Sequence, residues 1–440
     1  MITHIRMKNF KSWADSGEVE LAPLTGFFGT NSSGKSSLLQ MLLLLKQTTE
    51  QEDAEEVIFF GGENTLVKLG NFREVIHAHK LVAPLAFEFQ CHLTHPRSLI
   101  NIPEDGTPWE QKVDQFAYES IIQVENGKLI VEKLSYGSSL KGYAEIVCSE
   151  GRASFPRSNK TETNIQLENC YGKWSSGTTE SVKFLQKYVS AFEELFLYVF
   201  YLGPTRAHPQ RHYHWEGSHP TDIGHWGDKM IDALLSARVD LKTIQYDEEH
   251  VSIEEKISEW LREMDLAYSF SLERIETRDG KDYDVLVQKS PESAKVALAD
   301  MGYGLSQFLP VLVHCYYAPV GSTLILEQPG IHLHPMVQSQ LADLLIEVVN
   351  ERKLQILVES HSEHLLTRLQ RRIAEEKISS DQTALYFCRN DEGVSNIERL
   401  KMDEFGNIEN WPENFFGNEM GDLFAMTDAQ RERQKRAEGE

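Results

Sequence analysis

The amino-acid sequence predicts an α/β fold in which a β-rich block interrupts a parallel-sheet core. A strand, a glycine-rich loop and a leucine-rich segment follow one another within residues 24–45. Short alternating segments dominate residues 81–171, and strands alternate with helices from residue 306 to residue 376. Alternating strands and helices are typical of a parallel sheet covered by helices, whereas alternating polar and apolar residues are typical of antiparallel strands.

The individual elements follow from residue periodicity and from turn residues. Segments 2–7, 18–21 and 24–28 predict three short strands, because apolar residues alternate with polar ones or form a short apolar run. Segments 85–89, 121–124, 128–131 and 144–147 predict antiparallel strands separated by turns. The later chain predicts helices at 181–196, 228–236, 253–264, from 306, at 335–350 and at 364–376, a hairpin at 270–288 turning at 279–280, and strands at 323–326 and 354–358.

The composition is that of a soluble globular protein with a strongly acidic balance. The 440 residues include 67 acidic and 44 basic side chains, so the formal net charge is −23. This length allows up to about three domains of roughly 150 residues. Broad binding to a nucleic-acid backbone needs clustered lysine and arginine. DNA is therefore a possible partner that the charge does not favour.

No segment predicts a membrane span or an export signal. The most apolar stretch, Leu38 to Leu45, contains Gln40 and is followed by Lys46. It is much shorter than the roughly 18 apolar residues that a spanning helix needs. The five cysteines are scattered without a CxxC pair. We therefore expect reduced core thiols in a cytoplasmic protein that does not contact a membrane.

The strongest local motif is a loop with the pattern Gly29-x-x-x-x-Gly34-Lys35-Ser36 between a predicted strand and a predicted helix. The backbone N–H groups of such a loop, together with the helix N-terminus, wrap nucleotide phosphates, and glycine permits the close approach. Lys35 is expected to reach the outer phosphates, and the Ser36 hydroxyl to bind Mg²⁺. The nucleotide-binding residues predicted from this loop are Gly29, Asn31, Ser32, Ser33, Gly34, Lys35, Ser36 and Ser37.

Two apolar strands in the last third of the chain are followed by acidic side chains. One run is followed by Glu327 and the other by Glu359, and His361 lies two residues further on. Open α/β sheets place ligands at the carboxyl ends of their parallel strands. Glu327 is therefore expected to bind Mg²⁺ through water, and His361 could face the γ-phosphate.

Together these motifs resemble the ABC-type ATPases of the SMC, RecF and OLD branch. They look most like the stand-alone bacterial AAA-family ATPases of that branch, which lack long coiled-coil arms. This resemblance implies a P-loop NTPase head of the ABC type with an inserted β-rich subdomain and no long coiled coil. The segments that carry it are 9–12, the phosphate loop, 300–307, 327–335 and 360–363, together with 411–416 at a C-terminal signature.

The resemblance also implies roles for residues outside the phosphate loop. In the family, the signature loop of one subunit contacts the γ-phosphate that another subunit binds, and Gly302, Gly304 and Ser306 hold that place here. Lys11 and Ser12 resemble residues that border the adenine. ATP and Mg²⁺ are thus the expected cofactors. ATP is expected to join protomers head to tail in a dimer or a higher oligomer.

One residue departs from the family pattern. Most ABC ATPases place a water-activating glutamate directly after the Mg²⁺-binding acid, and this chain has Gln328 there. A carboxamide can orient a water molecule but cannot accept its proton as a carboxylate does. General-base catalysis typically contributes about 10²–10⁴-fold. We therefore expect slow hydrolysis, with Glu359 as a possible substitute base.

The predicted organisation is one discontinuous ATPase head. Residues 1–80 and 201–426 form the head, residues 81–200 form the β-rich insert and a helix, and residues 427–440 form a polar tail that is a frayed helix or disordered. About 80 residues follow His361, and they lack the acidic motifs of the Toprim nuclease that OLD-type proteins append. We therefore expect a separate protein to supply effector chemistry.

By resemblance, the chain is expected to be the sensor or motor subunit of a bacterial antiphage-defence or DNA-processing system with a separate nuclease or toxin partner. Gln328 leaves open a second function, an ATP-gated scaffold that holds a toxic partner without hydrolysis. A third, a DNA-repair ATPase that grips duplex DNA, would need a basic patch. The best candidate patch spans 368–372, although on a helix these arginines more often pair with Glu375 and Glu376.

Two weaker features remain ambiguous in the sequence. Five histidines gather within residues 208–225, but their spacing matches no established metal-ligand pattern and no cysteine is near. A partly exposed loop is therefore favoured over a metal site. Arg206 could reach the nucleotide or an opposite subunit, or it could form a structural salt bridge.

Overall fold

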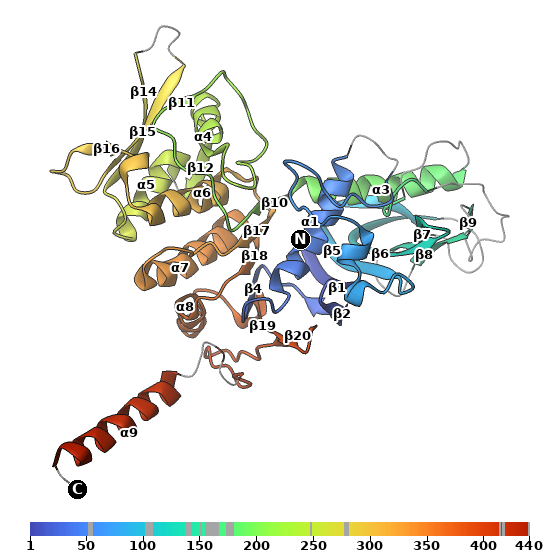
Figure 1. The fold of residues 1–440 in the computed structure, drawn as a ribbon. Coiled ribbons are helices and arrows are strands. Elements are labelled where there is room, and N and C mark those ends of the chain that lie inside the picture. Colours follow the sequence, from blue (N-terminus) through green and yellow to red (C-terminus); the bar gives the residue numbers. More distant parts are fainter. Residues whose placement is uncertain are drawn as a thin grey trace.

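The computed structural model describes residues 1–51, 56–101, 109–137, 143–149, 152–154, 167–172, 180–246, 249–276, 281–412, 415 and 419–438. In this part of the chain the strands form sheets of eight, six, four and two strands. Helices pack against these sheets (Figure 1). The predicted α/β fold class is confirmed, and the described helices include no long coiled coil.

The six-stranded sheet positions the residues of the site. Its order is β10 (Val199–Leu202), β17 (Thr323–Glu327), β18 (Gln355–Glu359), β4 (Leu24–Gly29), β19 (Thr383–Asp391) and β20 (Val394–Arg399). The first five strands are parallel and β20 is antiparallel. β4, β17 and β18 are buried along their whole length, as expected for a parallel sheet covered on both faces. Their carboxyl ends therefore meet at one edge.

Alternate residues of the parallel strands face two different hydrophobic cores. Phe27, Ile325 and Leu357 belong to the core that contains α1 (Lys35–Thr49). Phe28 and Val358 belong to the other core. That second core contains α4 (Met230–Val239), α5 (Ile253–Glu263), α6 (Tyr303–Tyr317), α7 (Pro335–Arg352) and α8 (Glu363–Ala374). The period-two alternation of a strand thus explains why these strands are apolar throughout.

The eight-stranded sheet is antiparallel and begins at the N-terminus. β1 (Ile2–Phe10) pairs with β2 (Trp13–Asp15), β3 (Val19–Glu20) and β5 (Leu85–Asn101), and the sheet continues through β6 (Trp109–Glu125), β7 (Lys128–Gly137), β8 (Tyr143–Ser149) and β9 (Arg152–Ser154). α3 (Glu180–Leu197) packs on β5 and on α1. Its Phe192 ring stacks on Tyr171 with ring centroids 5.0 Å apart. The β-rich block is therefore continuous with the N-terminal strands.

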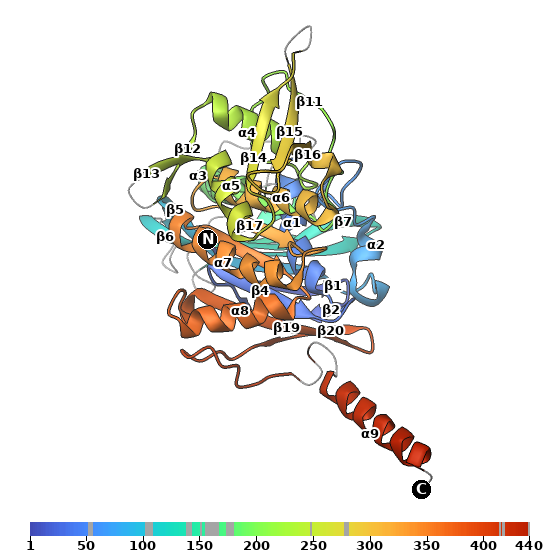
Figure 2. The ribbon, with the colours of Figure 1, turned by 90° about the vertical axis from the view of Figure 1, so that its left-hand side faces the viewer.

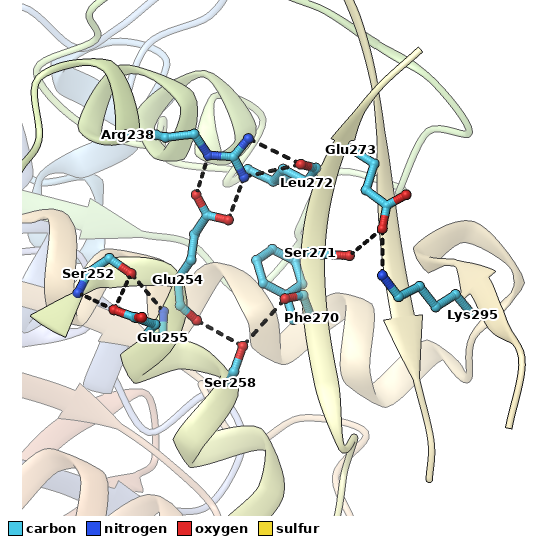
Figure 3. Close-up of polar contacts among 10 residues, drawn as sticks. All are labelled: Arg238, Ser252, Glu254, Glu255, Ser258, Phe270, Ser271, Leu272, Glu273 and Lys295. Carbon is cyan, nitrogen blue, oxygen red and sulfur yellow. Dashed lines mark hydrogen bonds and ion pairs between the residues drawn. The ribbon is translucent and has the colours of Figure 1, made fainter. Parts of the chain in front are cut away.

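A smaller sheet lies over α4–α6. It contains β11 (Tyr213–His214), β14 (Ser269–Arg274), β15 (Asp282–Gln288) and β16 (Lys295–Ala297), beside the hairpin of β12 (Thr243–Tyr246) and β13 (Glu249–Ser252). Side chains cap carbonyls of strand β14 (Figure 3). Arg238 donates to the Leu272 carbonyl and forms an ion pair with Glu254, while Ser258 donates to the Phe270 carbonyl. β14 is an edge strand of this sheet, and carbonyls that already accept hydrogen bonds are less available to another strand.

Short helices and a C-terminal helix complete the described chain. These are α2 (Phe72–Val75), η1 (His77–His79), η2 (Leu298–Asp300), η3 (Ser380–Gln382) and α9 (Glu419–Glu438). Figures 1 and 2 show α9 projecting away from the rest of the molecule. The predicted hairpin turn at 279–280, residues 413, 414 and 416 of the predicted C-terminal signature, and residues 439–440 of the predicted tail lie outside the described residues.

The predicted helices from residue 181 onward correspond to α3 through α8, with boundaries that differ by at most a few residues. Cys91, Cys170, Cys315 and Cys388 are free and buried. Among the described residues, no helix is long and apolar enough to cross a membrane.

The histidine-rich loop does not gather a metal-ligand cluster. Within the described ranges, no group of three His, Cys, Asp or Glu side chains could hold a metal ion. His212 lies 2.7 Å from Asp284, and His214 lies 2.8 Å from Asp282. These two histidines thus contact carboxylates of β15. This agrees with the prediction of a partly exposed loop.

His314 generates a prediction about acid stability. It is buried in α6, and burial lowers its pKa from 6.5 to about 4. The unfolded chain keeps the ordinary pKa, so this contribution to stability is complete above pH 6.5 and is lost as the pH falls toward 4. Between pH 7.5 and pH 5, we expect the wild type to lose about 2 kcal/mol more unfolding free energy than His314→Leu. Urea titrations of both proteins test this, and equal losses would contradict it.

Candidate functional site

A cavity of about 690 Å³ opens at the carboxyl ends of β4, β17 and β18. It brings together most of the site residues that the sequence predicted, although they come from segments more than 300 residues apart. The lining residues are Lys11, Ser12, Asn31, Ser32, Ser33, Gly34, Lys35, Ser36, Ser37, Gln40, Pro204, Glu327, Gln328, Ile331, Glu359 and His361.

The phosphate loop has a backbone conformation that requires its glycines. Gly29 has φ +137° and Gly34 has φ +92°, both of which favour glycine. A Cβ at Gly29 would lie 2.0 Å from the Cys388 carbonyl oxygen, and one at Gly34 would lie 2.4 Å from Ser395 Oγ. The Trp13 indole donates to the Gly34 carbonyl at 3.1 Å. The loop is thus held tightly between β2, β19 and β20.

The N-terminus of α1 leaves donors available to an anion. Its N-cap, Gly34, makes no side-chain capping bond, and no acidic residue lies in the first turn. Lys35 Nζ donates to the carbonyls of Gly29 and Thr30, at 3.2 Å and 2.7 Å. Burial lowers the pKa of Lys35, and the charge of Glu359 opposes that shift. Free helix N–H groups and an ammonium close to the loop fit a phosphate group.

Two buried carboxylates face this loop from neighbouring strands. Glu327 and Glu359 are paired residues of β17 and β18, and each is 6% exposed. Burial, followed by the charge of Glu359, raises the pKa of Glu327 to about 7. Burial also raises the pKa of Glu359, and hydrogen bonding to Ser36 and Gln328 opposes that shift. These two carboxylates therefore share a strongly desolvated position.

This donor set fits a divalent cation. Glu359 Oε2 is buried and has no hydrogen-bond partner among the described residues. Mg²⁺ prefers carboxylate and hydroxyl oxygens together with phosphates and water. Ser36, Glu327 and Glu359 offer such oxygens beside the phosphate loop. The residues present would therefore suit the Mg²⁺ that the motif implies.

Gln328 and His361 complete the edge of the cavity. Gln328 has φ +48°, and its backbone N–H donates to the Glu359 carbonyl at 2.9 Å. His361 is exposed, and its pKa is lowered by partial desolvation and by the Lys35 ammonium, with a hydrogen bond to the Gly29 backbone opposing the shift. The shift favours the neutral form of this imidazole beside the phosphate loop.

Residues 1–200 and 215–366 match the family described as the AAA ATPase domain. The chain belongs to this family. Residues 378–426 match a second family, described only as a protein of unknown function. No curated protein sequence matches the chain. The AAA ATPase is thus a nucleotide-binding protein, and the predicted class of activity, an ATPase, is confirmed at this level.

Solved structures similar to this AAA ATPase include heads of SMC proteins. One is an SMC head bound to the C-winged helix domain of ScpA, with 13% identity, a TM-score of 0.47, and coverage of 91% of this chain and 98% of that chain. The SMC head from Thermotoga maritima has 12% identity, a TM-score of 0.37 and coverage of 91% and 99%. The SMC head with an extended coiled coil bound to the C-terminal domain of ScpA, from Pyrococcus furiosus, has 13% identity, a TM-score of 0.42 and coverage of 91% and 96%.

The predicted signature residues of the AAA ATPase do not line the cavity. Gly302 is the N-cap of α6, without a side-chain capping bond and without an acid in the first turn. A Cβ on Gly304 would lie 2.8 Å from the His332 carbonyl oxygen, and Ser306 Oγ donates to the Tyr303 carbonyl. Contact between these residues and a nucleotide would need a second chain, which remains a prediction.

Two predicted adenine-border residues lie at the cavity edge of the AAA ATPase. Lys11 Nζ donates to Gln40, and Ser12 Oγ accepts a bond from Ser395 Oγ at 2.6 Å. Burial lowers the pKa of Lys11, and the charge of Glu327 opposes that shift. Their position next to the phosphate loop fits the predicted role, which stays a prediction.

Two residues contact the end of β17, of which sequence reasoning missed Tyr201 and gave Arg206 other partners. Tyr201 donates its hydroxyl to Glu327 Oε1 at 3.0 Å. Arg206, which was expected to reach the nucleotide, a second subunit or a carboxylate, instead donates to the backbone carbonyls of Pro204, Glu327 and Gln328. The Pro204-Thr205-Arg206 run after a strand was the available signal for Arg206. A tyrosine within an apolar strand gave no such signal.

The tight packing of the phosphate loop predicts different costs at two glycines. Gly29→Ala would meet the Cys388 backbone, whereas Gly17→Ala, at φ +64°, would meet nothing within 4 Å. We expect Gly17→Ala to cost about 1 kcal/mol of unfolding free energy through its backbone conformation alone. Gly29→Ala should cost at least about 2 kcal/mol more, since the clash adds to the strain, and should weaken ATP binding. Urea unfolding and fluorescent-nucleotide titration measure both, and equal costs would contradict this account.

Proposed function

We propose that this protein is an ABC-type ATPase that binds ATP with Mg²⁺ and hydrolyses it slowly. The observation that carries the proposal is the shared cavity in which the phosphate loop faces Glu327 and Glu359. Lys35 and the N-terminus of α1 would bind the phosphates, and Ser36 and Glu327 would hold Mg²⁺. The cation would neutralise phosphate charge and fix the orientation of the outer phosphate.

Three further residues have proposed catalytic roles. Gln328 would orient the attacking water, because a carboxamide can donate and accept hydrogen bonds. Glu359 would take the water proton, and its Oε2 is free of hydrogen-bond partners among the described residues. His361 would contact the γ-phosphate from the edge of the cavity. The missing carboxylate at residue 328 is the reason to expect slow turnover.

We also propose that ATP joins two or more protomers head to tail. Gly302, Gly304 and Ser306 lie outside the cavity, so a contact with nucleotide would come from another copy. The uncapped start of α6 offers N–H donors of the kind that bind an anion.

The proposed cellular role is that of a sensor or regulatory subunit, in the cytoplasm, of a bacterial antiphage-defence or DNA-processing system. A separate nuclease or toxin would act as the effector. This role rests on the resemblance of the motifs, and the net charge of −23 makes a protein partner more favourable than DNA. The arginines of the predicted basic patch are engaged in ion pairs, because Arg368 and Arg372 pair with Asp343, and Arg371 pairs with Glu375. A grip on duplex DNA is therefore the weaker alternative.

Gln328 also favours a second candidate function, an ATP-gated scaffold that holds a toxic partner without turnover. The motor and the scaffold differ in the expected rate of ADP release. Activation of ADP release by a candidate partner or by double-stranded DNA would support the motor. A complex that stays intact in ATP, with no turnover, would support the scaffold.

The two-chain proposal predicts an ATP-dependent change in mass. We expect the 50.3-kDa chain to at least double in mass with ATP and Mg²⁺ but not with ADP, as measured by light scattering. Gly302→Glu should prevent this change, because the added carboxylate would repel the phosphates of the other copy. Nothing lies within 4 Å of a Cβ at Gly302 or at Gly62, so Gly62→Glu is a matched control. An unchanged mass of the wild type with ATP would contradict the shared site.

The identity of residue 328 predicts the rate of hydrolysis. We expect wild-type turnover below ~10 per second and at least a tenfold increase in Gln328→Glu, which restores a carboxylate at the water. Glu359→Gln should lower the rate of the wild type. Phosphate-release assays at saturating ATP test both. Turnover above ~10 per second that is lost in Glu359→Ala and kept in Gln328→Ala would show that Gln328 is not limiting.

A further inference from the structure

Two polar side chains outside the phosphate loop reach the end of β17. Both come from β10 and the turn that follows it. β10 pairs with β17 in parallel, with Tyr201 opposite Ile325. The Tyr201 hydroxyl donates to Glu327 Oε1 at 3.0 Å. An aromatic side chain has few rotatable bonds, so this donor approaches the carboxylate from a fixed direction.

Arg206 holds the backbone at the same end of β17. Its Nη2 donates to the Glu327 carbonyl at 2.9 Å, and its Nη1 donates to the carbonyls of Pro204 at 2.9 Å and Gln328 at 3.3 Å. The planar guanidinium thus bridges the turn after β10 and the turn after β17 with a fixed fork of donors.

Burial of the Arg206 side chain should lower the stability of the fold. The side chain is 2% exposed, and no ion pair to a carboxylate is found for it among the described residues. Its Nε is buried without a hydrogen-bond partner. Buried charges in proteins are usually paired, because desolvation is expensive. A residue kept in this state at the edge of a ligand cavity is better explained by what it positions.

The backbone that Arg206 binds is itself strained. Gln328 has φ +48°, a left-handed conformation that costs a residue other than glycine free energy. The turn is held from one side by the Gln328 N–H bond to the Glu359 carbonyl at 2.9 Å. Arg206 holds the same turn from the β10 side of β17, whereas Glu359 lies on the β18 side. Together these bonds fix where the side chains of Glu327 and Gln328 leave the backbone.

We propose that Tyr201 and Arg206 are positioning residues that aim the Glu327 carboxylate and the Gln328 side chain at the bound nucleotide. The inference rests on the proposed Mg²⁺-binding role of Glu327. Groups that hydrogen-bond to metal ligands orient them, and their loss typically costs about 10–100-fold in metal affinity or activity. Neither residue is expected to touch the phosphates.

The test compares nucleotide affinity with and without Mg²⁺. A fluorescent ATP analogue is titrated into each full-length protein in excess EDTA and in Mg²⁺, and the ratio of the two Kd values measures the gain from the cation. The test variants are Tyr201→Phe and Arg206→Lys. Arg352→Lys is a matched control, since Arg352 is also buried and donates to a backbone carbonyl, that of Ala318. Tyr386→Phe is the second control, because Tyr386 donates to the Glu20 carbonyl.

We expect all five proteins to bind the analogue within about twofold of one another in EDTA, because the phosphate loop is unchanged. In Tyr201→Phe and Arg206→Lys, the gain from Mg²⁺ should fall about tenfold, while both controls keep the wild-type gain. Tyr201→Phe removes a single oxygen atom, so it keeps the test valid if Arg206→Lys does not fold.

Other results would overturn the inference. A wild-type gain in both test variants, with melting temperatures lowered as in the controls, would show that the residues are only structural. If Glu327→Gln loses the gain while both test variants keep it, the positioning role fails and the proposed function stands. If the wild type shows no gain from Mg²⁺, both the proposed cation site and the positioning role are wrong.

Discussion

The parallel pairing of β18 with β4 on one side and β17 on the other is the constraint on which the rest of the site depends. In this register Glu359 lies opposite both Phe27 and Glu327, so the acidic pair ends level with the start of the phosphate loop. A slip of β18 by one residue would turn the Glu359 carboxylate to the opposite face, away from Glu327. Gln355, buried at the start of β18, opposes such a slip, because its side chain binds the backbone of Ile2 and the Thr323 hydroxyl.

The antiparallel sheet supports the phosphate loop from the side. Trp13 of β2 is fully buried, and its indole donates to the Gly34 carbonyl. Ser395 of β20 binds the backbone and the hydroxyl of Ser12, at 2.8 Å and 2.6 Å. These bonds join the N-terminal strands to the edge of the parallel sheet around the loop. The β-rich block therefore belongs to the structure that holds the phosphate-loop cavity, since β5 extends the sheet that β1 and β2 begin.

The sequence predicted the features that depend on neighbouring residues, and it did not predict those that depend on contacts between residues far apart in the chain. The phosphate loop is a local pattern, and Glu327 and Glu359 follow from a general rule about strand ends, so these residues could be placed without a structure. The pairing of β5 with β1, and the contacts of Tyr201 and Arg206 with residues more than 120 positions away, could not be placed. Only the tertiary pairing of strands brings such residues together. The histidine-rich loop was ambiguous for the same reason, because its carboxylate partners lie on β15.

The charges around the cavity explain why this site should respond to a cation. Burial raises the pKa of both Glu327 and Glu359, and it lowers the pKa of both Lys35 and Lys11. Each shift favours the neutral form of its group, so the cavity resists holding isolated charges. With a pKa of about 7, Glu327 titrates near neutral pH. A divalent cation would displace that proton and compensate both carboxylates, while phosphates would compensate the lysines. The cation thus offsets the desolvation of the two carboxylates, and the nucleotide offsets that of the two lysines. This favours binding of the cation and the nucleotide together.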